Sequence, residues 1–127
     1  MNQPAHPLIS IIIPCTDSLV LPAILTALRN QIPGAEQLEI LLVGSDRHQT
    51  IRPEVPIKFF STGPEASCAS DKRNLGMQIA QGDYFLFLDD DCIPDPGWLR
   101  GLLDRLVSGE AVVGGAVRFS RRNYFQM

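Results

Sequence analysis

Three successive aspartates, Asp89, Asp90 and Asp91, directly follow the apolar run over residues 84–88. A short, aromatic-rich run after a glycine is typical of a strand buried on both faces, as in a parallel sheet. Open α/β sheets bind ligands at the carboxyl ends of their strands, and neighbouring carboxylates repel each other unless cations or hydrogen-bond donors balance them. The pattern therefore indicates a divalent metal site that holds a phosphorylated ligand. The alternative is a solvated acidic turn that also caps the next helix.

The elements that must position these aspartates alternate along the chain. Strands are expected over residues 8–13, 38–43, 57–60, 84–88 and 111–117, where apolar β-branched or aromatic residues gather. Helices are expected from Leu21 to a stop at Pro33, from a cap at Ser67 or Ser70 to Gly82, and from Asp95 to Gly109. This alternation predicts an α/β fold, namely an open, mostly parallel, twisted sheet of Rossmann-like type with helices on both faces.

Length and charge narrow the class of protein. A chain of 127 residues suits a single domain over residues 1–127, with a loose lead-in over 1–7 and a tail over 119–127. The net charge of −3 offers no general attraction to nucleic acid or to anionic lipid. The sequence has no apolar run of membrane-spanning length and no signal-peptide pattern, and its three cysteines lack a disulfide or zinc spacing. These features predict a cytoplasmic protein.

Four segments, in order, resemble the N-terminal half of the family-two glycosyltransferases, which have the A-type nucleotide-sugar-binding fold. They are residues 10–14 with Asp17 close behind, residues 39–43, residues 72–76 with 80–84, and residues 87–91 with 94–99. The resemblance implies binding of a nucleoside-diphosphate sugar, with a UDP-sugar as the first expectation, and Mn²⁺ or Mg²⁺ as cofactor. It also implies a truncated fold, because the acceptor-binding half and the catalytic base of the family lie beyond the matched segments, so no catalytic residue is assigned.

The resemblance also assigns roles to individual residues. Asp91 would be the strongest metal ligand, Asp89 would lie near the ribose or the metal, and Asp90 completes the Asp-x-Asp motif. The chemistry suits these residue types, because a hard cation held by carboxylates stabilises the charge that develops on a diphosphate leaving group. Arg73, with Lys72 as the second choice, is expected to contact phosphate near a helix start. A solvated helix face is the alternative for both cations.

The nucleobase pocket is expected at the ends of the first two strands. By resemblance, Pro14, Cys15, Thr16 and Asp17 form its wall, and Asp17 can cap a helix as well. Ser45 stands where the family commonly has an aspartate, so it brings a hydrogen-bonding group without charge.

Two further interpretations stay open. The chain could be a non-catalytic interaction module with a vestigial site, possibly a homodimer, because aromatic residues and a sheet edge favour interfaces. A homo-oligomer, or a partner chain that supplies an acceptor half, is compatible with either interpretation. A phosphoacceptor domain ranks below both, because it would need more acids after the first strand and a lysine after the last one.

Overall fold

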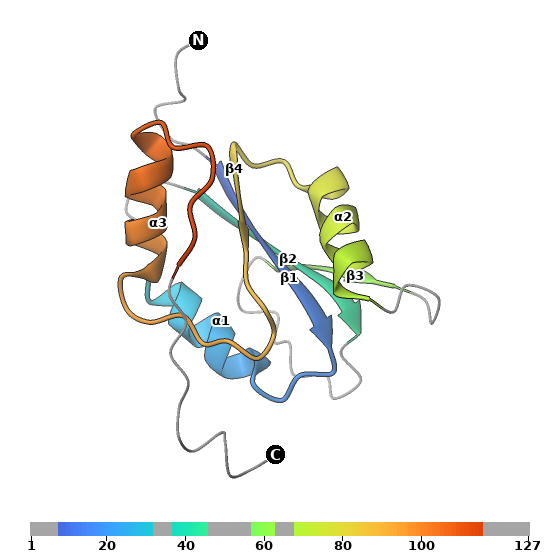
Figure 1. Cartoon of the computed structure of the whole chain (residues 1–127). Coiled ribbons are helices and arrows are strands. Elements are labelled where there is room, and N and C mark those ends of the chain that lie inside the picture. The colour runs from blue at the N-terminus through green and yellow to red at the C-terminus, as the bar shows by residue number, and fades with distance from the viewer. Residues whose placement is uncertain (1–7, 32–36, 46–56, 63–67, 116–127) are drawn as a thin grey trace.

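The computed structural model describes residues 8–31, 37–45, 57–62 and 68–115. Seven elements follow one another in these segments (Figure 1). They are β1 (Leu8–Thr16), α1 (Leu21–Arg29), β2 (Gln37–Ser45), β3 (Ile57–Ser61), α2 (Ala69–Ile79), β4 (Tyr84–Phe87) and α3 (Trp98–Val107). None of the helices in these segments combines the length and the apolar character that a membrane crossing requires.

The four strands form one parallel sheet in the order β3-β2-β1-β4. β1 runs through the middle and pairs with β2 from Leu8 to Thr16, and with β4 from Ile9 to Ile12. Its central position explains its sequence, because a strand covered on both faces has no solvent-facing positions for polar residues. The predicted α/β fold with an open parallel sheet is confirmed.

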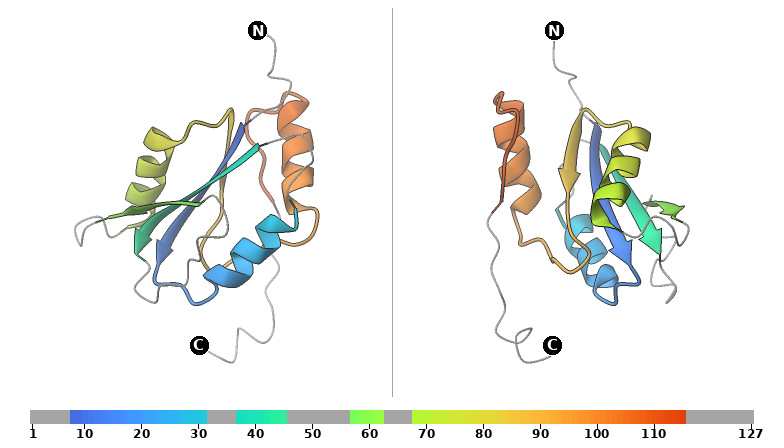
Figure 2. Two further views of the ribbon diagram at one scale, coloured as in Figure 1. Left: turned by 180° about the vertical axis from the view of Figure 1, so that it is seen from behind. Right: turned by 45° about the vertical axis from the view of Figure 1, so that its right-hand side comes forward.

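Helices cover both faces of the sheet, with α1 and α3 on one face and α2 on the other (Figure 2). The larger core lies on the α1 and α3 side, where alternate residues of β1 meet the apolar stripes of the two helices. Its fully buried members include Ile9, Ile11, Ile13, Leu21, Ile24, Leu28, Leu99 and Leu103. On the opposite face, Gly76 of α2 lies so close to Ile12 that a Cβ would stand 2.5 Å from its Cγ2 atom. Gly76 therefore allows α2 to pack closely against β1.

A buried polar cluster joins the amino-terminal ends of the strands. Glu39 of β2 is 6% exposed, and its carboxylate accepts hydrogen bonds from Ser10 Oγ (2.6 Å), Lys58 Nζ (2.8 Å) and the backbone N–H of Gln81 (3.0 Å). Burial by itself would raise the pKa of Glu39, but the hydrogen bonds and the charge of Lys58 lower that pKa below its usual value of 4.5. The cluster therefore holds an ionised carboxylate inside the fold, at the end of the sheet opposite to Asp89.

β4 is buried on one face only, so the prediction of a strand covered on both faces is wrong. Leu86 is 4% exposed, whereas Phe85 and Phe87 are 39% and 43% exposed. The reason is its place in the sheet, because β4 is an edge strand and α2 packs against β1 and β2 instead.

Three predicted boundaries also differ from the structure. No strand forms over residues 111–115, and residues 116 and 117 lie outside the described segments. The cap of α2 is Cys68, whose Sγ accepts a hydrogen bond from the N–H of Asp71, and the helix ends at a cap on Ala80 before Gly82. α3 begins after Gly97, whose φ of 86° breaks the helix, so Asp95 closes a preceding turn instead of capping the helix.

Candidate functional site

A polar pocket of ≈ 370 Å³ lies where the carboxyl ends of β1 and β4 meet the start of α2. Parallel strands bring their carboxyl ends to one edge, which is where open α/β sheets place their ligands. Cationic side chains come from α2, and carboxylates come from the segment after β4. The lining residues are Pro14, Thr16, Ala69, Lys72, Arg73, Asp89, Asp90 and Asp91.

Lys72 carries a buried positive charge on the α2 side of the pocket. Its side chain is 5% exposed, and Nζ donates hydrogen bonds to the carbonyl oxygen of Cys15 (3.0 Å) and to Thr16 Oγ1 (2.7 Å). Both acceptors are neutral, and no carboxylate of the described segments pairs with this ammonium. A buried charge without a counter-ion is costly unless an anion joins it, so Lys72 favours an anionic ligand in the pocket.

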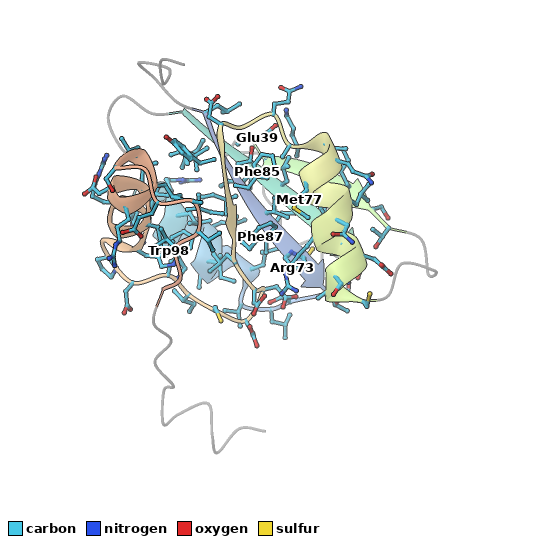
Figure 3. The ribbon with its side chains drawn as sticks, turned by 45° about the horizontal axis from the view of Figure 1, so that its top comes forward. Glu39, Arg73, Met77, Phe85, Phe87 and Trp98 are labelled. Carbon is cyan, nitrogen blue, oxygen red and sulfur yellow. The ribbon has the colours of Figure 1, made fainter. Side chains whose placement is uncertain are left out.

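Arg73 links α2 directly to the aspartates. Its Nη2 donates to Asp89 Oδ1 at 2.7 Å, and the two side chains are 35% and 55% exposed. In Figure 3, Arg73 extends from α2 toward the end of β4. Both residues line the pocket, so the pair joins its cationic side to its acidic side.

Asp90 ties the end of β1 to the segment after β4. Its Oδ2 accepts a hydrogen bond from the N–H of Thr16 at 2.8 Å, and its carbonyl oxygen accepts one from Ser18 Oγ at 2.6 Å. The carboxylate of Asp90 therefore holds the end of β1 in position.

The ends of β1 and β2 approach each other closely at Gly44. This glycine has φ of 142°, and a Cβ on it would stand 1.8 Å from the carbonyl oxygen of Cys15, so no other residue fits. The next residue, Ser45, uses its carbonyl oxygen to accept a hydrogen bond from the N–H of Asp17 at 2.9 Å. Asp17 itself has φ of 49°, a left-handed conformation that aspartate tolerates better than most residues.

Asp89, Asp91 and Cys92 could hold a metal ion together, because one ligand atom of each lies within 4.8 Å of the others. Burial raises the pKa of the Cys92 thiol, and its hydrogen bond to Asp91 and the nearby carboxylates raise that pKa further. The two carboxylates of this group suit Mg²⁺ or Mn²⁺, because these ions take oxygen ligands and complete their shells with substrate phosphates and water.

The pocket brings together seven of the residues that the sequence proposes for the site: Pro14, Thr16, Lys72, Arg73, Asp89, Asp90 and Asp91. Cys15, Asp17 and Ser45 are not among its lining residues; Cys15 is 1% exposed and contributes only its carbonyl oxygen to Lys72. Thr16, which the resemblance also assigned to the wall of the base pocket, lines this pocket. Its Oγ1 accepts a hydrogen bond from Lys72 Nζ, and its N–H donates one to Asp90 Oδ2.

Comparison with known proteins gives one family. The family model described as Glycosyl transferase family 2 matches residues 10–127, which is nearly the whole chain. No curated protein matches the chain. The matched range contains every residue that lines the pocket.

Proposed function

The chain belongs to glycosyltransferase family 2, and from that membership we propose that it binds a nucleoside-diphosphate sugar with Mn²⁺ or Mg²⁺ in this pocket. The observation that carries the proposal is the division of the pocket into two charged sides. Lys72 and Arg73 of α2 face Asp89 and Asp91 after β4. A metal-bound diphosphate carries both an anionic and a cationic part, so it complements both sides.

Each residue of the pocket then has a role. Asp91 and Asp89 hold the cation, and the cation supplies Lewis-acid stabilisation of the diphosphate leaving group. Arg73 binds phosphate oxygens through its planar guanidinium, and Lys72 adds a fixed point charge. Asp90 keeps Thr16 in place, so it acts as a positioning residue.

The base-binding side of the site is proposed at the ends of β1 and β2. Pro14 and Thr16 supply the wall beside the phosphates. Cys15 lies between them in β1, Asp17 follows Thr16, and Ser45 of β2 pairs with Thr16. A uracil base is the first expectation. Transfer of the sugar also requires an acceptor site and a base catalyst, which a partner chain could supply.

Titration calorimetry tests this proposal with UDP, GDP and TDP, each with and without Mn²⁺. We expect micromolar binding of one nucleotide that requires the metal and is lost in Asp91→Ala. Asp104→Ala is the matched control, because Asp104 is an exposed aspartate of α3 paired with Arg100. Absence of binding for all three nucleotides, or unchanged binding in Asp91→Ala, would contradict the proposal.

A second candidate function is that of an interaction module. The observation that favours it is the open face of β4, where Phe85 and Phe87 are 39% and 43% exposed at the edge of the sheet (Figure 3). Met77 of α2 is 39% exposed as well. Exposed aromatic residues and unpaired strand edges favour association. Light scattering over a range of concentrations would show a dimer that Phe87→Ser weakens, whereas a monomer throughout the range would exclude self-association through this face.

A further inference from the structure

The Arg73–Asp89 ion pair ties up one of the two proposed metal-binding carboxylates in the free protein. From this arrangement we infer that Arg73 makes the site selective for a metal–diphosphate complex, and unfavourable for the metal ion or the diphosphate by itself. The inference rests on the proposed function, because it concerns the same pocket and the same ligand class. It adds a specificity-determining role for one residue.

A bare dication meets two obstacles in this pocket. Oδ1 of Asp89 already accepts a hydrogen bond from Arg73 Nη2 at 2.7 Å. The positive charge of Arg73 therefore weakens the attraction of this carboxylate for a cation. The positively charged guanidinium also repels a second cation bound to the same carboxylate. Mn²⁺ or Mg²⁺ by itself should therefore bind weakly.

A diphosphate without metal meets the opposite obstacle. Its oxygens would be attracted by Lys72 and Arg73, but Asp89, Asp90 and Asp91 line the same pocket and repel them. The anion must also compete with Asp89 for the hydrogen bonds of Arg73.

A ligand that carries both charges removes both obstacles. Phosphate oxygens can replace Asp89 as acceptors of the hydrogen bonds from the Arg73 guanidinium. This exchange frees Asp89 to bind the cation beside Asp91. One ion pair within the protein is replaced by two interactions with the ligand. Metal and diphosphate thereby raise each other's affinity, and this reciprocal coupling is what thermodynamic linkage requires.

The ion pair is weak enough to be exchanged. With side chains 35% and 55% exposed, it belongs to the solvated class of salt bridges. Its removal should tighten the binding of the metal alone by about two- to fivefold. Loss of the guanidinium should weaken the metal–nucleotide complex by about tenfold or more, because hydrogen bonds between charged groups are the stronger kind.

The test compares Arg73→Gln with the wild-type chain in two assays. Electron paramagnetic resonance of free Mn²⁺ measures the affinity for the metal alone, and calorimetry at saturating Mn²⁺ measures the affinity for UDP, GDP and TDP in turn. We expect opposite changes in Arg73→Gln, with tighter Mn²⁺ binding and weaker nucleotide binding. Arg105→Gln is the matched control, because Arg105 forms an exposed ion pair with Glu110 on α3, and it should change neither affinity.

The outcomes separate the two claims. If the wild-type chain binds a metal–nucleotide complex and Arg73→Gln binds Mn²⁺ equally well or more weakly, the inference is overturned and the proposed function stands. A wild-type chain that binds no nucleotide under any condition overturns both. A purely structural role for Arg73 would weaken both affinities together, so the opposite signs distinguish selectivity from loss of fold.

Discussion

Among the three aspartates, Asp90 is the one whose structural role can be tested separately from metal binding. Asp90→Ala removes the acceptor for the N–H of Thr16, which lies 2.8 Å from Oδ2, but keeps the backbone carbonyl that accepts from Ser18. A hydrogen bond to a charged group contributes about 1.5–3 kcal/mol when it is buried. Asp90 is half-buried and Thr16 is exposed, so hydrogen bonds to water can replace part of this contribution in the variant. We expect a loss of about 1 kcal/mol, or about 3–5 °C in Tm for a domain of this size.

Urea and thermal unfolding measure that loss, and Mn²⁺ titration measures binding in the same variants. Asp90→Asn retains an acceptor oxygen and should restore most of the stability. Asp91→Ala should show the reverse behaviour, with near-native stability and lost Mn²⁺ binding. Asp104→Ala is the control for removing an exposed carboxylate, with an expected change under about 0.5 kcal/mol. The reasoning would be refuted if Asp90→Ala kept its stability and lost the metal.

Three further predictions concern stability. Gly44→Ala should lower the free energy of unfolding by about 3 kcal/mol or more, because the added Cβ would overlap the carbonyl oxygen of Cys15. Gly101→Ala lies in open space on α3, so it should raise the free energy of unfolding in urea by about 0.5–1 kcal/mol. The lowered pKa of Glu39 means that its ionised form stabilises the fold fully above pH 4.5, and that this contribution is lost as the pH falls through the lower folded value. Unfolding curves of the wild type and Glu39→Gln should therefore converge in acid, and a constant difference would count against the assignment. Gln31→Ala should cost about 1 kcal/mol in thermal unfolding, because Gln31 Oε1 accepts from the N–H of Leu99 in the first turn of α3, where a helix offers no acceptor of its own. An unchanged Tm would exclude this role.

Local patterns predicted the type and order of the first seven elements, because hydrophobic periodicity and turn residues act over a few neighbouring positions. Boundaries were less accurate where two local signals competed. Asp95 and Pro96 form a good helix start in sequence, but Gly97 can adopt a left-handed φ and delays α3 by two residues. The strand expected over residues 111–117 shows the limit of propensity, because residues 111–115 find no neighbouring strand to pair with in the described segments.

The sequence by itself determined the α/β fold class, the family, and the placement of three carboxylates at the end of a strand. Only the tertiary structure decided which groups Asp89 and Asp90 contact. Asp89 pairs with Arg73, which is 16 positions away in the sequence, and Asp90 bonds Thr16, which is 74 positions away. Contacts between such distant residues depend on the order of the strands and the placement of the helices. The exposed face of β4 has the same cause. An apolar run indicates a strand, but whether the strand is central or at an edge depends on which strands pair, and pairing is a long-range property of the chain.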